Sequence, residues 1–255
     1  MRVFATYNIK GGVGKTATAV NLAYLSALEG NRTLVWDLDP QGAATYYFRI
    51  RAKVKGGGRK LVKGKKDIDL TIRGTDYDGL DLLPADFSYR NMDLDLETTK
   101  KPTKQLARLL LPLALQYDHL FLDCPPSISL VSESVFVAAD ALLVPTIPTT
   151  LSLRTLVQLS SHLKRKKSRR PRILSFYCMV DRRKSLHRRI CDTTPESPVS
   201  MLETSIPYST YVEQMGSRRT PLNSFAGSTA AAKAYEALWR EIRVEFDRIG
   251  MEKSQ

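Results

Sequence analysis

The feature that most constrains this chain is a glycine-rich run near its start, Lys10-Gly11-Gly12-Val13-Gly14-Lys15-Thr16. It lies between residues 2–9, an apolar segment that reads as a strand, and residues 16–29, whose apolar residues have helical spacing. Glycines here let backbone N–H groups turn toward an anion, and the following helix adds its N-terminus. A lysine and a threonine in register supply a cation for phosphates and a hydroxyl for magnesium. The run predicts a phosphate-binding loop, whereas a plain glycine turn would leave Lys15 and Thr16 unexplained.

The rest of the chain alternates between short apolar runs and helical patterns. Residues 33–38 form a continuous apolar run with aspartates at its end, which is typical of a buried parallel strand. Such alternation predicts an α/β fold with a doubly wound, mostly parallel sheet flanked by helices. We expect further strands at residues 80–83, 119–123, 141–145 and 173–179, and helices at residues 103–116 and 152–164.

The length of 255 residues suits one large α/β domain, and we expect a single domain over residues 1–255. Residues 49–73 are basic and contain glycines, so we expect an irregular segment with short helices there. Residues 228–249 have apolar residues at helical spacing, which predicts a C-terminal amphipathic helix that caps the sheet. A membrane-surface helix is the alternative, and its mixed-charge polar face disfavours it.

Three aspartates lie at the carboxyl ends of predicted strands. Asp37 and Asp39 follow one strand, and Asp123 ends another. Carboxylates at this edge of an open parallel sheet face its ligand crevice, where they can hold metal-bound water or orient an attacking water. A solvated strand end is the alternative. The two interpretations have equal weight for Asp37, whereas a direct role is favoured for Asp39 and Asp123.

Several runs resemble the motifs of one protein family. Residues 10–16, 34–42 and 121–127 are similar to the deviant Walker A loop, the second motif and the Walker B segment of the ParA/MinD family of P-loop ATPases. Residues 181–183 and 204–209 resemble further family segments, the second of which holds the adenine through its backbone. The resemblance implies ATP and Mg²⁺ as cofactors, slow ATP hydrolysis, and the short type of ParA that has no N-terminal DNA-reading domain.

The resemblance also implies a role for individual residues. Lys10 is similar to the signature lysine that reaches across an ATP-sandwiched dimer to the partner's nucleotide, and a plain surface lysine is the less favoured interpretation. Asp39 is implied to position the attacking water, Asp123 to contact magnesium through water, and Asp37 to support both. We therefore expect catalytic roles for Lys10, Lys15 and Asp39. The expected metal site is Thr16, Asp37 and Asp123. The expected nucleotide-binding residues are Gly11, Gly12, Val13, Gly14, Lys15, Thr16, Ala17, Asp181, Pro207 and Ser209.

Two departures from the family pattern affect this assignment. Ala17 stands where members commonly carry a second threonine, and Tyr208-Ser209 stands where arginine and asparagine are frequent. They weaken the implied contacts to the α-phosphate and the adenine.

Lys and Arg outnumber Asp and Glu by 39 to 26, and the net charge of +13 predicts affinity for polyanions. Basic residues gather in residues 49–66, 164–172 and 182–189. A single basic cluster is as often a solvated surface as a binding site. Three such clusters in a chain without a base-reading module favour sequence-independent binding to DNA phosphates. Arg218 and Arg219 are similar in placement to DNA-contacting arginines of ParA proteins. The DNA-binding residues expected are Arg182, Arg183, Arg188, Arg189, Arg218 and Arg219.

The three cysteines have no metal-type spacing, and the residues after Met1 do not read as a signal peptide, so we expect a cytosolic protein. The resemblance implies that it associates with the nucleoid and has no membrane partner. The resemblance implies a switch that forms a homodimer with ATP, binds non-specific double-stranded DNA, and hydrolyses ATP when a small partner or adaptor protein stimulates it. Its cargo would be a plasmid, a chromosome region or a protein assembly such as a carboxysome. A MinD-like membrane-associated ATPase and a metabolic P-loop ligase are the alternatives.

Overall fold

The computed structural model describes residues 1–65, 67–166, 170–193, 199 and 201–252, and the side chains as far as residue 246. Within these residues seven strands form one sheet in the order β3-β4-β2-β5-β1-β6-β7, in which all neighbours are parallel except β3 and β4. The strands are β1 (Arg2–Thr6), β2 (Thr33–Asp37), β3 (Arg73–Gly74), β4 (Leu80–Leu83), β5 (His119–Asp123), β6 (Ala141–Thr146) and β7 (Arg172–Tyr177).

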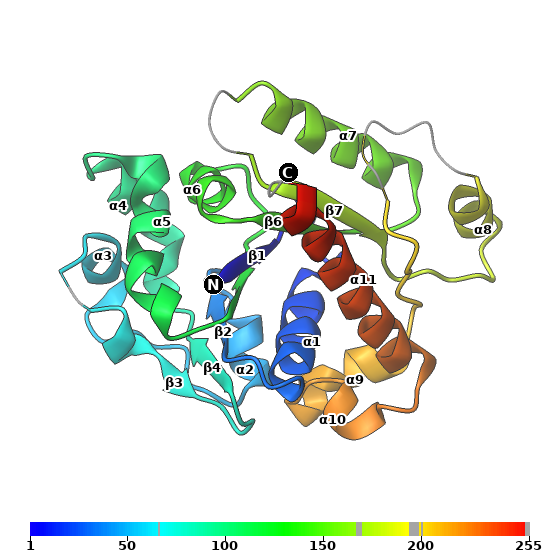
Figure 1. Cartoon of the computed structure of the whole chain (residues 1–255), viewed down its shortest axis with the longest axis horizontal. Coiled ribbons are helices and arrows are strands. Elements are labelled where there is room, and N and C mark those ends of the chain that lie inside the picture. The colour runs from blue at the N-terminus through cyan, green and yellow to red at the C-terminus, as the bar shows by residue number, and fades with distance from the viewer. Residues whose placement is uncertain (66, 167–169, 194–198, 200, 253–255) are drawn as a thin grey trace.

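Helices cover both faces of this sheet (Figure 1), which confirms the predicted fold class. The α-helices are α1 (Lys15–Leu28), α2 (Ala43–Tyr47), α3 (Gly57–Val62), α4 (Met92–Glu97), α5 (Gln105–Leu110), α6 (Leu130–Ala138), α7 (Thr150–Lys164), α8 (Ser185–Asp192), α9 (Thr210–Arg218), α10 (Asn223–Ala226) and α11 (Ala230–Glu252). Short 3₁₀ turns are η1 (Asp69–Thr71), η2 (Phe87–Asn91), η3 (Pro102–Lys104) and η4 (Leu111–Leu115).

Side chains along each strand alternate between the two faces of the sheet, which gives the protein two hydrophobic cores. Phe4 of β1 packs with the residues of α1 and α11, whereas Val3 and Ala5 pack with those of α3 to α7 on the other face. Successive side chains of a strand point to opposite faces, so a strand buried on both sides reads as one apolar run. The continuous apolar run of β2 follows this rule, since all five of its residues are buried.

The structure corrects some boundaries. The strand predicted at residues 2–9 ends at Thr6, because the chain turns there into the glycine loop. The single helix predicted at residues 103–116 is wrong: η3, α5 and η4 follow one another instead. Pro112 lies in this stretch, and a proline lacks the N–H that a continuous helix needs and clashes with the preceding turn. Helix α6, which begins at a capping box of Ser129 and Ser132, was not predicted.

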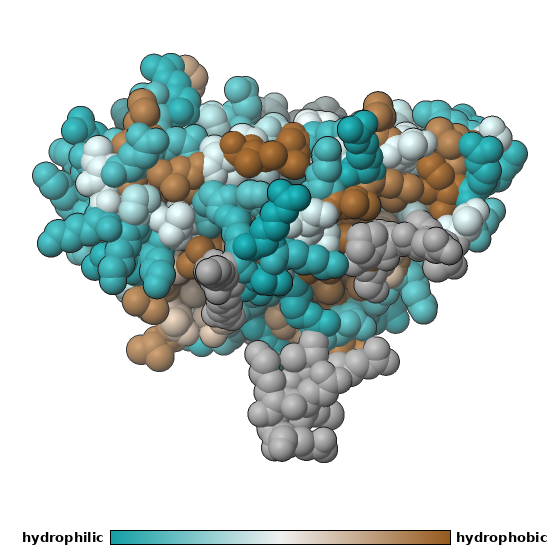
Figure 2. Space-filling view, turned by 90° about the horizontal axis from the view of Figure 1, so that it is seen from above, coloured by the Kyte–Doolittle hydropathy of each residue, from teal (hydrophilic) through white to brown (hydrophobic). Residues whose placement is uncertain are grey.

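The predicted C-terminal helix covers the sheet. Four residues of its apolar stripe, Tyr235, Leu238, Trp239 and Ile242, are at most 1% exposed, and α11 packs against α1 (Figure 1). The stripe residue Ile249, together with Lys66 and residues 167–169 of the basic stretches, lies outside the described side chains. Among the described helices, none combines the length and apolar character needed to cross a bilayer. The face in Figure 2 is largely hydrophilic, with its hydrophobic residues in separate groups.

Candidate nucleotide site

The predicted loop connects β1 to α1 in a conformation that needs its glycines. Gly12 has φ 69°, and Gly14, which caps α1, has φ 95°. A Cβ at Gly14 would also lie 2.9 Å from the Cys178 sulfur. Nothing lies within 4 Å of a Cβ placed at Gly11 or Gly12, and both residues are exposed. The loop therefore leaves an open cradle in front of the helix N-terminus, which suits a phosphate group.

Lys15 lies at the base of this cradle. It is only 7% exposed, and its ammonium donates a hydrogen bond of 3.0 Å to the Lys10 carbonyl. Burial lowers the pKa of Lys15, while Asp123 and Asp39 oppose that shift. The ammonium is thus held across the loop, close to the carboxylates at the strand ends.

Lys10 contributes its backbone to the loop. Its N–H donates to the Asn8 side-chain oxygen at 3.0 Å, and the Asn8 amide in turn donates to the Pro145 carbonyl at 2.9 Å. The Lys10 ammonium forms no hydrogen bond or salt bridge within the part of the chain that the structure describes. A cation beside the cradle is therefore available for another anion.

Asp37 is fully buried, and the protein itself uses both of its oxygens. One accepts from the Thr45 N–H at 2.8 Å and the Thr45 hydroxyl at 2.7 Å, and the other accepts from the Asp39 N–H at 3.2 Å. Burial raises its pKa to about 6 despite these hydrogen bonds. Asp37 thus holds the turn between β2 and α2, and with it Asp39.

Asp123 differs from Asp37 in how its carboxylate is satisfied. One oxygen accepts from the Thr6 hydroxyl at 3.3 Å, and the other is buried with no hydrogen-bond partner. Burial, followed by the charge of Asp37, raises its pKa well above the ordinary value, and the Thr16 hydroxyl and Lys15 partly oppose this. An unpartnered carboxylate oxygen beside a threonine hydroxyl fits the water shell of a hydrated Mg²⁺ ion.

Asp39 reaches the cradle from the next loop. It is partly exposed, and one carboxylate oxygen accepts from the Gln41 N–H at 2.9 Å. It lines a hollow of about 330 Å³, a size within the range of small-molecule sites. The hollow is lined by Gly11, Gly12, Gly14, Lys15, Thr16, Ala17, Asp39, Ala43, Tyr47, Pro126, Met179, Val212 and Glu213.

Several lining residues were not predicted from the sequence. Pro126 lies within the third motif run, so its position carried a signal that could have been used. No motif marks the other four, which are Tyr47 of α2, Met179 just after β7, and Val212 and Glu213 of α9. Their approach to the loop is a product of the tertiary fold. Val13, by contrast, is predicted and buried, and its side chain packs away from the hollow.

Three further residues predicted to bind the nucleotide, Asp181, Pro207 and Ser209, are not among the residues that line this hollow. Asp181 is held by Arg183 through two hydrogen bonds of 2.9 and 3.0 Å, which lower the pKa of its carboxyl to about 2. Pro207 forms a β-bridge with Val180, and the Ser209 hydroxyl caps α9 by accepting from the Tyr211 N–H. The side chains of Asp181 and Ser209 therefore already have hydrogen-bond partners within the protein.

The predicted DNA-binding arginines lie in two separate places. Arg182 and Arg183 lie before α8, and Arg188 and Arg189 lie on it; all four are exposed. Arg218 ends α9, and Arg219 caps it with φ 54°. The two groups are therefore carried by different helices.

A glycine cradle between the first strand and first helix, a buried lysine behind it, and carboxylates at the ends of neighbouring parallel strands together define a P-loop nucleoside triphosphatase. A family model described as an AAA domain matches residues 1–175. The chromosome partitioning protein ParA of Caulobacter vibrioides (strain NA1000 / CB15N) is 30% identical over 250 residues, which cover 95% of this chain and 94% of that protein. The chain belongs to the ParA/MinD family of P-loop ATPases.

Solved structures also resemble the chain. The ATP complex of a Cyanothece McdA variant has a TM-score of 0.80 at 20% identity and covers 95% of this chain and 96% of its own. Cobyrinic acid a,c-diamide synthase from Mycobacterium smegmatis, with a bound ATP analogue and magnesium, has a TM-score of 0.77 at 25% identity over 95% of this chain and 96% of its own. The fold is therefore shared by McdA and a biosynthetic enzyme.

Proposed function

We propose that this chain, acting as a single domain, is an ATP-dependent switch that dimerises with ATP, binds non-specific DNA and hydrolyses ATP when a partner protein stimulates it. The observation that carries the proposal is the uncommitted Lys10 ammonium beside a complete phosphate cradle. A single nucleotide site needs only Lys15, so a second lysine whose ammonium has no partner among the described residues suits the phosphates of a nucleotide held by a second copy.

The residues of the cradle divide the work of phosphoryl transfer among them. Backbone N–H groups from Gly11 to Gly14 and the Lys15 ammonium would hold the phosphates of ATP. Thr16 would ligate Mg²⁺, which supplies charge neutralisation when bound, and Asp123 would accept a hydrogen bond from its water shell. Asp39 would orient the attacking water from the rim of the hollow, and Asp37 would hold Asp39 in place.

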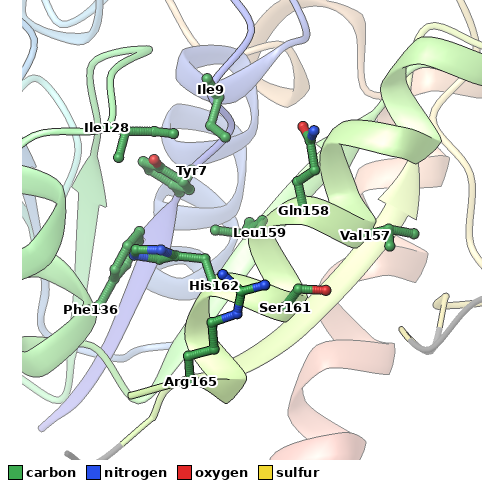
Figure 3. A pocket seen from close by; sticks show the side chains of 10 residues that line it. All are labelled: Tyr7, Ile9, Ile128, Phe136, Val157, Gln158, Leu159, Ser161, His162 and Arg165. Carbon is green, nitrogen blue, oxygen red and sulfur yellow. The ribbon is translucent and has the colours of Figure 1, made fainter.

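A hollow next to the cradle, lined mainly by apolar side chains, supports a second copy on this face (Figure 3). Its volume is about 540 Å³, and Tyr7, Ile9 and Ile128 line one side of it while residues of α7 line another. Ile9 directly precedes Lys10, and Ile128 follows the loop that carries Pro126. Exposed apolar side chains there include Ile128, at 63%, and Val157, at 37%. A copy that receives Lys10 would cover this surface as well.

Lys10→Ala tests the proposal directly. With ATP and Mg²⁺, the unsubstituted protein is expected to become dimeric by light scattering and to bind double-stranded DNA of arbitrary sequence at low salt. Lys10→Ala should lose the dimer and weaken DNA binding at least about tenfold, as expected for a lost charge-assisted contact. Lys233→Ala, on the exposed side of α11, is the matched control. DNA binding that neither ATP nor Lys10→Ala changes would contradict the proposal.

A metabolic ligase is the second candidate, and the likeness to the diamide synthase favours it. A ligase needs a pocket for its organic substrate beside the phosphates. The 330 Å³ hollow extends from the cradle only as far as Tyr47, Met179 and α9. ATP turnover that depends on an added carboxylic acid and an amine donor, with no response to DNA, would favour the ligase over the switch.

The membrane alternative depends on the C-terminal helix. Its described apolar stripe is buried against α1 and the sheet, so it would have to leave the core to enter a bilayer. Co-sedimentation with anionic vesicles, with and without ATP, distinguishes the two: we expect no ATP-dependent binding. The stimulating partner and the cargo are best sought among proteins encoded beside this one, and a nucleoid location follows from the proposed DNA binding.

A further inference from the structure

Four basic side chains surround one hollow on the side of the molecule that carries β3. The hollow is about 640 Å³ and is lined by Ile50, Arg51, Lys53, Lys55, Arg73 and Gly74. The four basic residues are exposed. Neither Arg51 nor Lys53 forms a salt bridge within the described parts of the chain. These two cations therefore face solvent with their charge available.

A second basic group joins this hollow through Arg49. The Arg49 guanidinium donates to the carbonyls of Arg219, at 3.1 Å, and Arg218, at 3.3 Å, across 170 residues of sequence. Arg219 in turn lies over the Tyr46 ring at 4.5 Å and donates to the Tyr46 carbonyl at 3.1 Å. The fold thus merges two basic stretches into one surface, called here the Arg51 surface: Arg51, Lys53, Lys55, Arg73, Arg218 and Arg219.

Four cations of the other basic stretches pair with carboxylates of their own neighbours. Lys166 pairs with Glu133, and Arg172 pairs with Glu245 at 3.2 Å. Near α8, Arg183 is held by Asp181 at 2.9 Å, and Arg182 lies 4.0 Å from Asp192. On the Arg51 surface, the nearby carboxylate of Asp86 accepts the Val54 and Ser88 N–H groups, and these hydrogen bonds and, to a smaller extent, the charge of Lys53 lower its pKa. Phosphate contacts there need not break an existing ion pair of Arg51 or Lys53.

Two helices connect this surface to the nucleotide site. Helix α2 begins with Ala43 and ends with Tyr47, both in the nucleotide hollow, and Arg49 follows two residues later. Helix α9 places Val212 and Glu213 in the hollow with its first turns and carries Arg218 at its end. The two helices pack against each other. A shift of either helix on nucleotide binding would move the basic side chains at its far end.

From these contacts we infer that the Arg51 surface, rather than the cluster on α8, is where this chain binds the phosphate backbone of double-stranded DNA, and that α2 and α9 couple it to the nucleotide. The inference rests on the proposed function. The backbone is recognised through charge, so binding is independent of base sequence and weakens with salt. The segment between Arg49 and Arg73 then has a task that no catalytic motif assigns to it.

The test measures DNA binding by fluorescence anisotropy, with a labelled duplex of arbitrary sequence and a non-hydrolysable ATP analogue over a series of salt concentrations. Arg51→Glu/Lys53→Glu is expected to bind at least about tenfold more weakly, and Arg51→Ala/Lys53→Ala should lower the slope of log K against log salt by about 2. Lys233→Glu/Arg240→Glu, an equal charge reversal on the exposed side of α11, should bind as the unsubstituted protein does. Each variant should bind a fluorescently labelled ATP analogue with unchanged affinity, which shows that it is folded.

The outcomes separate this inference from the proposed function. If the unsubstituted protein shows no nucleotide-dependent DNA binding, the proposed function fails and the inference fails with it. If it binds and the Arg51/Lys53 variants bind equally well, only the inference is overturned. Loss of binding in Arg188→Glu/Arg189→Glu alone assigns the contact to α8 and overturns the inference too. The inference is also overturned if Arg51→Glu/Lys53→Glu loses binding to anionic vesicles but keeps its binding to DNA.

Discussion

Strand β5 carries an aspartate at each end, and the two differ in almost every physical respect. Asp118, just before the strand, is partly exposed and accepts two side-chain hydrogen bonds from Arg32, which lower its pKa to about 2. Asp123, at the other end, is fully buried with one oxygen unpartnered, and its pKa is raised. At the amino edge of the sheet the ionised aspartate stabilises the fold, whereas at the carboxyl edge burial disfavours the ionised form.

The surroundings of the two ends differ in the same way. At the amino edge, His119 bonds to Ser26 at 2.7 Å, and Trp239 packs on His119 and donates to Glu29 at 2.9 Å. At the carboxyl edge, Asp37, Asp123 and Lys15 are buried together, and burial shifts the pKa of each toward its neutral form. Perturbed charges of this kind gather at functional sites, where a ligand completes the network. The carboxyl edge, where Asp123 keeps an unpartnered oxygen, is the edge proposed above to bind the nucleotide.

The largest effect is expected from Trp239→Ala at the amino edge. This side chain is 1% exposed between α1 and the sheet, so its removal should lower the free energy of unfolding by about 3–5 kcal/mol. Urea denaturation measures the change, and Trp239→Phe, which keeps most of the volume, should cost far less. Nucleotide affinity of the folded variant should stay within about twofold, given its distance from the cradle. A large loss of nucleotide affinity would contradict the view that the two edges of the sheet act independently.

Asp123→Asn and Asp118→Asn form the sharpest pair. The raised pKa of Asp123 means that its ionisation opposes folding as the pH rises above the unfolded value, so the neutral Asn should raise the thermal midpoint of the nucleotide-free protein at about pH 7. It should also reduce Mg²⁺-dependent ATP hydrolysis by about 100-fold. The lowered pKa of Asp118 has the opposite sign, because its ionised form favours folding above the unfolded pKa. Asp118→Asn should therefore lower the midpoint slightly and leave hydrolysis unchanged.

Gly14→Ala tests the strain at the loop. The position has φ 95° and lies against the Cys178 sulfur, so an alanine should cost about 1–3 kcal/mol of stability and weaken nucleotide binding. Gly14→Ala/Cys178→Ala should recover part of this loss, because it removes the close contact and leaves the backbone strain. Chemical denaturation and nucleotide titration follow both effects. Full recovery in the double variant would show that φ contributes nothing.

The smallest effect concerns pH. Burial lowers the pKa of His119 to about 4, so the folded state keeps this ring neutral while the unfolded chain takes up a proton below about 6.5. Its contribution to stability is complete above that pH and is lost as the pH falls toward 4. His119→Gln should remove about 0.7 kcal/mol of the acid destabilisation between about pH 7 and 6, measured as the difference between the two unfolding curves. Identical pH profiles would contradict this assignment.

Local sequence was enough to predict the loop, the sheet and the carboxyl-end aspartates. Glycine spacing, apolar periodicity and polar residues at strand ends act over a few neighbouring residues, so the chain displays them before it folds. The helix predicted across Pro112 failed, although the residue that breaks it was in view. Tyr47, Met179 and Val212 reach the cradle from far along the chain, and nothing in their local pattern indicates it.

Three features were determined by the sequence itself: the glycine loop at residues 10–16, the alternation of strands and helices that gives a mostly parallel sheet, and the total positive charge. Only the tertiary structure decided that Asp37 accepts hydrogen bonds from the protein while one oxygen of Asp123 has no partner. It also decided that Arg49 contacts Arg218 and Arg219 across 170 residues of sequence. The physical reason is that backbone conformation follows from neighbours in sequence. Burial, pKa and the pairing of charges follow instead from neighbours in space, which exist only once the sheet and its helices have packed.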